Sequence, residues 1–185
     1  MKKLLIIIAL CLSVLNISFA DVTIEIMNLS QKTMRVTYIL EETLENSKDT
    51  TLPSNGFEFA SGSIKVISVR ELNTEQPLKY EIVKKNNLEA VKIYYPNPLP
   101  KGGNYRIECI VEAQSAFINK TADGLYEFSY FTGNDAYFIL PKDHAVVYSN
   151  LPIILYDKNG QIVVLVKEDE YFPHKIVLKT KSYAD

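Results

Sequence analysis

The sequence predicts an all-β fold, a two-sheet antiparallel β-sandwich of about 10–13 strands with no substantial helix after an N-terminal signal peptide. Three observations indicate this fold class. Apolar and polar residues alternate along most of the chain, as they do on the two faces of a strand. Turn-forming residues separate these stretches at regular spacing. No apolar pattern with a period of 3.6 residues continues for three helical turns.

Residues 1–20 have the three parts of a Sec-type signal peptide. Two lysines precede an apolar run at 4–15, and Ser18 and Ala20 provide the small residues of a cleavage site. The apolar run has 12 residues, whereas a membrane-spanning helix needs ~20. We therefore expect cleavage after Ala20 and export to the periplasm or the extracellular space. The alternative is an uncleaved signal that anchors the chain in the inner membrane.

The chain that remains, 21–185, is mildly acidic. Loss of the two N-terminal lysines changes the formal net charge from −2 to −4. This charge, without a basic stripe, argues against nucleic acid as a partner, and no stable membrane insertion is expected once the signal is cleaved. Cys109 is then the sole cysteine, so no internal disulfide can form. Its position on the apolar side of a strand predicts a buried, inert thiol.

Strands are predicted in both halves of the chain from the alternation of apolar residues. In the first half they lie at 22–26, 34–40, 56–59, 64–69, 78–82 and 91–95. In the second half they lie at 105–111, 125–131, 136–140, 145–148, 153–158, 161–166 and 175–179. A polar stretch at 41–55 is longer than most loops, and we expect it either to be mobile or to cover another part of the molecule.

Residues 96–103 interrupt this pattern with three prolines and two glycines. Prolines cannot donate to a β-ladder, and glycines permit the chain to reverse. We interpret the break as a corner where the chain crosses from one sheet to the other within a single domain, 21–185. The alternative is a linker between two smaller β-domains, 21–96 and 103–185.

Residues 93–113, IYYPNPLPKGGNYRIECIVEA, combine a strand, a Pro-Leu break, a Gly-x-Tyr element and a second alternating strand. This stretch resembles the N-terminal β-domain of zinc aminopeptidases and ribophorin-type exported β-sandwich domains. The resemblance implies one continuous β-domain with an accessory or docking role. The catalytic zinc motif of the aminopeptidases, His-Glu-x-x-His, is absent from this chain, so the resemblance implies no enzymatic activity.

A β-hairpin is predicted at 153–166, IILYDKNGQIVVLV, because Asn159 and Gly160 accept the positive φ angles of a type I′ turn. The turn sets the register of the two strands. The expected cross-strand pairs are Lys158 with Gln161, Tyr156 with Val163, and Ile154 with Leu165.

Neither face of this hairpin is polar, although a sandwich strand normally keeps one face in water. One explanation is that the second face binds another protein. The candidate interface residues are Ile154, Tyr156, Val163 and Leu165. The other explanation is that the hairpin is the most enclosed pair of strands, covered by the stretch at 41–55.

Three aromatic residues, Tyr126, Phe128 and Tyr130, share one face of a predicted strand. Aromatic rings on a flat sheet face can stack on sugar rings, so these residues are a candidate carbohydrate platform. The competing interpretation is that the rings fill the sandwich core, with their hydroxyl groups at its rim.

No motif for catalysis, metal binding or cofactor binding is found, and His144 and His174 are interpreted as surface residues. We therefore predict an exported, non-enzymatic protein-binding or envelope-assembly module that needs no cofactor, with another envelope or secreted protein as its partner. A carbohydrate-binding module is the alternative. A hydrolase with a dispersed carboxylate site is a third hypothesis.

Overall fold

The computed structural model describes residues 20–52, 62–85, 88–115, 117–132, 135–167 and 169–181. No helix is present among these residues, and hence none that is long and apolar enough to cross a membrane. Fourteen strands are described. They are β1 (Ala20–Asn28), β2 (Thr33–Glu42), β3 (Asp49–Thr51), β4 (Lys65–Glu71), β5 (Lys79–Lys85), β6 (Leu88–Tyr94), β7 (Tyr105–Gln114), β8 (Ile118–Lys120), β9 (Tyr126–Thr132), β10 (Ala136–Ile139), β11 (His144–Ser149), β12 (Ile154–Lys158), β13 (Gln161–Val166) and β14 (Asp169–Thr180).

The predicted all-β sandwich is confirmed. The described strands slightly exceed the predicted number of about 10–13, because the three-residue strands β3 and β8 each add a short sheet edge. The predicted strand at 56–59 lies outside the described residues.

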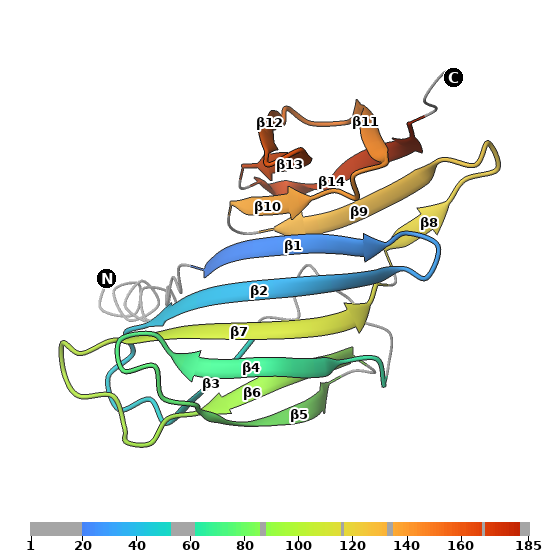
Figure 1. Cartoon of the computed structure of the whole chain (residues 1–185). Coiled ribbons are helices and arrows are strands. Elements are labelled where there is room, and N and C mark those ends of the chain that lie inside the picture. Colours follow the sequence, from blue (N-terminus) through green and yellow to red (C-terminus); the bar gives the residue numbers. More distant parts are fainter. Residues whose placement is uncertain are drawn as a thin grey trace, which may run out of the picture.

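The strands form three sheets (Figure 1). The largest has seven strands in the order β12-β13-β10-β1-β2-β7-β4, and the others have the orders β11-β14-β9-β8 and β3-β6-β5. All described pairs are antiparallel except β1 with β10, which is parallel and departs from the predicted antiparallel sheets. No hairpin turn sets the direction of this pair, because β10 follows β9, which belongs to another sheet.

Buried side chains from all three sheets belong to one hydrophobic cluster, so the two smaller sheets pack against the large one. In β2 and β7 every second residue is buried, as the alternation predicts. Phe128 of β9 packs edge to face on Phe138 of β10, with ring centroids 5.1 Å apart. Near the start of β7, Tyr105 stacks on Tyr95, with centroids 4.4 Å apart. Each fully buried large apolar side chain stabilises the fold by about 1.5–3 kcal/mol.

The Pro-rich stretch at 96–103 crosses from one sheet to another. It connects β6, in the three-stranded sheet, to β7, in the seven-stranded sheet. The backbone of Leu99 accepts a hydrogen bond from Asn46 N (2.8 Å) and donates one to Ser47 O (2.9 Å). Strands from both sides of the corner are neighbours in the seven-stranded sheet, where β2 and β4 both pair with β7.

The same hydrogen bonds place the polar stretch at 41–55, as far as it is described, beside the corner. It contains β3, which pairs with β6, and it ends in the buried Leu52. In its described part, 41–52, this stretch does not cover the hairpin at 153–166 as hypothesised, because its strand completes the three-stranded sheet instead.

The outer face of β1, β2, β7 and β4 is polar and carries ion pairs. Arg35 bridges Glu25 (Nη1 to Oε2, 3.2 Å) and Glu112 (Nη2 to Oε1, 2.7 Å). Its hydrogen bond lowers the pKa of Glu112. Arg70 of β4 donates from Nε to Glu108 Oε2 of β7 at 2.8 Å. This part of the sheet therefore has the wetted face expected of a sandwich strand.

Candidate functional site

The hairpin of β12 and β13 forms one edge of the seven-stranded sheet, and its predicted geometry is confirmed. Its pairs include Lys158 with Gln161, Tyr156 with Val163, and Ile154 with Leu165. Asn159 and Gly160 have φ angles of 56° and 80°, as a type I′ turn requires. Asp157 Oδ1 accepts a hydrogen bond from Gly160 N at 3.1 Å and closes the turn.

The two strands of the hairpin differ in burial. β12 is outermost, and Ile154, Leu155 and Tyr156 are 52%, 50% and 40% exposed. β13 lies between β12 and β10, and Val163 is only 2% exposed. The candidate interface is thus divided, with Ile154 and Tyr156 open to solvent, Val163 buried and Leu165 partly buried.

A second apolar edge lies at the same end of the molecule. It is β11, the outer strand of the four-stranded sheet, which is joined to β12 by a short connection (Figure 1). Val147 and Tyr148 of this strand are 51% and 52% exposed. A cavity of about 340 Å³ lies beside β12, with Ile154 in its wall. It is lined by Leu151, Pro152, Ile153, Ile154, Leu165, Lys167 and His174.

Of the candidate carbohydrate platform, Phe128 faces the core. Phe128 is 1% exposed, and Tyr126, which is half-buried, lies edge to face with His144 at 5.9 Å. The side chain of Tyr130 lies outside the described residues. Because a buried ring cannot stack on a sugar, Phe128 does not form part of an exposed platform, and the core interpretation describes the strand better.

Both histidines are buried, so their interpretation as surface residues is wrong. His144 and His174 are 8% and 3% exposed. His144 Nδ1 lies 2.8 Å from Asp143 Oδ1, and its Nε2 lies 3.3 Å from Thr180 Oγ1. The hydrogen bond with His144 lowers the pKa of Asp143. These contacts tie the start of β11 to the end of β14, and no group of three or more metal-ligating side chains occurs in the described part of the chain.

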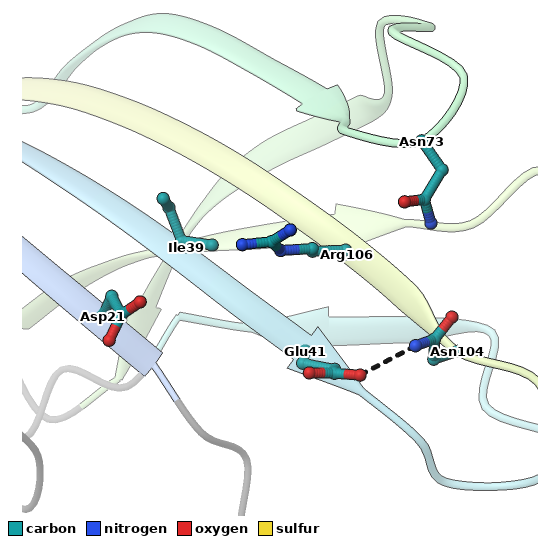
Figure 2. Close-up of a pocket in the computed structure, with 6 residues that line it drawn as sticks. All are labelled: Asp21, Ile39, Glu41, Asn73, Asn104 and Arg106. Atoms are coloured by element: carbon teal, nitrogen blue, oxygen red, sulfur yellow. Dashed lines mark hydrogen bonds between the residues drawn. The ribbon is translucent and has the colours of Figure 1, made fainter.

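A polar cavity of about 340 Å³ lies near the start of β1 (Figure 2). It is lined by Asp21, Ile39, Glu41, Asn73, Asn104 and Arg106. Asn104 Nδ2 donates to Glu41 Oε1 at 2.7 Å. The charged and amide side chains are exposed, and a ligand gains little from each such contact in water. We assign no ligand to this cavity.

Cys109 is buried, as predicted, with 0% exposure. Burial raises the pKa of its thiol to about 12. Because the thiolate is the reactive form of cysteine, this side chain belongs to the core and is not a nucleophile.

The described residues define a β-sandwich with exposed apolar side chains on the edge strands β11 and β12. No protein-family model and no curated protein matches the chain. Solved structures do match its fold, at identities where the likeness concerns the fold alone.

They include M1 zinc metallopeptidases and an aminopeptidase N family protein. A two-domain M1 zinc metallopeptidase variant bound to L-tryptophan has a TM-score of 0.55 and 11% identity, over 86% of this chain and 41% of that one. The M1 zinc metallopeptidase from Deinococcus radiodurans has a TM-score of 0.53 and 10% identity over the same shares. An aminopeptidase N family protein from Idiomarina loihiensis has a TM-score of 0.51 and 10% identity, over 86% of this chain and 29% of that one.

The chain therefore spans about two fifths or less of these proteins, and the matched part is their N-terminal β-domain. This confirms the resemblance suggested by residues 93–113.

Sequence reasoning did not single out Leu155, Val147 or Tyr148 as exposed. The sequence contained a signal of this exposed surface, because β11 and β12 are both apolar on both faces. The same pattern occurs in β13, which is buried. Only the order of the strands in the sheet explains why β13 is buried and β12 is exposed.

Proposed function

We propose that this protein is an exported, non-enzymatic β-sandwich module that binds another envelope or secreted protein. Binding uses the end of the sandwich where β11 and β12 lie, and we call the exposed apolar side chains there the open end. The open end consists of Val147, Tyr148, Ile154, Leu155 and Tyr156. The observation that carries the proposal is that these large apolar side chains, 40–52% exposed, belong to two outer strands, β11 and β12, which lie at the same end of the molecule (Figure 1).

Exposed apolar side chains are common singly, but five of them on two neighbouring sheet edges favour a binding role. Aromatic side chains such as Tyr148 and Tyr156 supply much of the energy at protein interfaces when a partner buries them. The likeness to a non-catalytic domain of larger proteins supports a docking role over catalysis.

The test is affinity capture from envelope extracts with the exported protein as bait. We expect the Ile154→Lys, Tyr156→Lys double variant to capture at least about tenfold less of its partner, because each lysine brings a desolvation cost into the interface. The matched control is Tyr80→Lys, Ile82→Lys on β5, where the side chains are 46% and 43% exposed.

Both variants are checked for folding by circular dichroism, and the captured protein is identified by mass spectrometry and rebound as a purified component. Equal loss in the two variants, or undiminished capture by the open-end variant, contradicts the proposal.

Export is part of the proposal and rests on residues 1–20. Mass spectrometry of the protein recovered from the periplasm or medium is expected to find a chain that begins at Asp21. Recovery of the full-length chain in the membrane fraction instead indicates the anchored alternative.

A further inference from the structure

The direction of the backbone N–H and C=O groups of β12 can be assigned residue by residue. Lys158 and Gln161 flank a two-residue turn, so they exchange both backbone hydrogen bonds. In an antiparallel pair, hydrogen-bonded and non-hydrogen-bonded positions alternate. The backbone groups of Ile154, Tyr156 and Lys158 are therefore directed at β13, and those of Leu155 and Asp157 are directed away from it.

An independent hydrogen bond supports this assignment. Ile162, which lies opposite Asp157, accepts a hydrogen bond at its backbone oxygen from Leu140 N at 3.0 Å. Its carbonyl thus points towards the β10 side of the sheet and away from β12. The pair of Asp157 and Ile162 is then a non-hydrogen-bonded pair, and the N–H and C=O of Asp157 lie on the open side.

The centre of this edge lacks the devices that normally prevent a sheet edge from pairing with another chain, and the charged residues Asp157 and Lys158 lie at its end beside the turn. Its central residues, 154–156, include no proline and no charge, and the register of β12 with β13 shows no bulge. Among the described strands, β12 pairs with β13 alone. The edge therefore offers backbone donors and acceptors beside apolar side chains, which is the template for strand addition.

The sequence of this edge is complementary to itself. In the antiparallel register that places Leu155 opposite the partner's Leu155, the outward-directed residues of both copies form hydrogen-bonded pairs. Tyr156 then lies opposite the partner's Ile154 on the same face, an aromatic–aliphatic pair of the kind that stabilises sheets. Shifting the centre to Tyr156 instead places Leu155 against the partner's Asp157.

We propose that β12 pairs with β12 of a second copy of this chain, centred on Leu155, in a two-fold dimer that joins the two seven-stranded sheets. This inference rests on the proposed function, protein binding at the open end, and names a second copy as an occupant of that surface. A two-fold operation makes the contact isologous and closed, so it yields dimers and no fibres.

The buried area indicates the strength of this dimer. Three side chains that are about half exposed offer roughly 250 Å² of apolar surface per copy, given that a large side chain buries ~150–250 Å². With the strand backbones, the total approaches the lower limit of specific interfaces, about 1,000 Å². The dimer is therefore weak, with a Kd on the order of tens of micromolar.

The test is sedimentation velocity of the exported full chain from about 1 μM to 1 mM, with hydrogen exchange measured at both ends of the range. We expect a concentration-dependent shift from monomer to dimer. The amides of Leu155 and Asp157 are expected to exchange fast in the monomer and slowly in the dimer. Those of Ile154, Tyr156 and Lys158 are expected to be protected in both.

Two variants separate backbone pairing from side-chain contact. Leu155→Pro removes the outward N–H and leaves the ladder to β13 intact, so it is expected to weaken dimerisation by about tenfold or more. Leu155→Ala keeps the N–H and is expected to weaken it less. If Leu155→Pro does not fold, the exchange measurement on the unaltered chain decides.

A monomer at all concentrations overturns the inference, as does a dimer in which Leu155 and Asp157 remain unprotected. If these amides are protected only when a different, captured protein is bound, the dimer inference is also overturned. The proposed function is supported in that case. A dimer with the expected protection that captures no other protein leaves this inference intact and contradicts the proposed heterologous partner.

Discussion

The two edges of the seven-stranded sheet are built in opposite ways. β4 carries charged Lys65 and Arg70, has a bulge between Val66 and Ser68, and is bridged by Pro77 on its outer side. β12 presents apolar side chains at 154–156 in unbroken register with β13, and its charged residues, Asp157 and Lys158, lie at the turn end. Charge, bulges and proline are means by which sheet edges avoid pairing with other chains. One edge is therefore closed to strand addition and the other is open, although both belong to the same sheet.

The comparison shows that the exposed apolar side chains of β12 are specific to that edge. The fold itself does not require an outer strand to be apolar. β4 is also an outer strand of this sheet, yet it is hydrogen-bonded on its other side, from Glu71 N to Gln76 O (2.9 Å) and from Leu78 N to Val69 O (3.0 Å). The predictions below alter one edge or the other, beginning with the largest expected effect.

Burial within the hairpin can be tested by two substitutions on the same face. Val164 is fully buried and lies opposite Leu155, which is half exposed. We expect Val164→Ala to lower the free energy of unfolding by about 2 kcal/mol, because it leaves a cavity in the core. Leu155→Ala is expected to change it by less than about 0.5 kcal/mol. Urea denaturation measures both, and similar costs would show that β12 is enclosed.

A substitution at Gly160 is expected to strain the turn between β12 and β13 without adding a side-chain contact. Gly160 has a φ of 80°, and a Cβ added there would meet no atom within 4 Å. Gly160→Ala is therefore expected to cost about 1 kcal/mol from backbone conformation alone, and to speed exchange at Ile154 and Tyr156.

Gly124 is the matched control for this turn. It has a φ of 79° and equally open surroundings, but it precedes β9. Gly124→Ala is expected to cost a similar free energy and to leave exchange in β12 unchanged. Faster exchange in β12 in both variants would show that its stability depends on the whole fold and not on its own turn.

The closed edge can be opened by removing its charges. We expect the Lys65→Val, Arg70→Val double variant to form assemblies larger than a dimer at high concentration, because it then has a second apolar edge. Sedimentation velocity measures this. Thr23→Val with Thr37→Val adds apolar surface to the same face away from an edge, and it is expected to assemble like the unaltered chain.

The ion pairs near β4 predict a small dependence of stability on pH. The hydrogen bond from Arg35 lowers the pKa of Glu112 below its ordinary value of 4.5 in the folded state. The resulting stability is present above pH 4.5 and is lost as the pH falls through the lowered folded-state pKa. Glu112→Gln is expected to flatten the slope of stability against pH in that window, as measured by urea denaturation. An unchanged slope would show that the pair contributes nothing.

Local pattern was sufficient for much of the fold. The alternation of β2 and β7, the break in the strand pattern at 96–103 and the register around Asn159-Gly160 all follow from contacts between residues close in sequence, or from backbone preferences. The burial of Cys109 follows from the same alternation. These features could be predicted because period and turn chemistry are properties of single strands and single turns.

The candidate site could be predicted only in part. An apolar residue on a two-sided apolar strand is either deeply buried or at an exposed edge, and Ile154 and Val163 show both outcomes in one hairpin. Phe128 looked suited to a sugar platform, yet its face packs against Phe138 in the facing sheet. The histidines are buried because distant strands close over them.

By itself, the sequence determined that this chain forms short alternating strands, where most of them turn, and that 153–166 is a hairpin. The tertiary structure alone decided that β12 is an edge, that β1 and β10 pair in parallel, and which face of each strand is covered. The physical reason is the range of the interactions. Turn geometry and side-chain alternation act within a few residues, whereas strand order is chosen by packing among segments far apart in the chain, which no local pattern records.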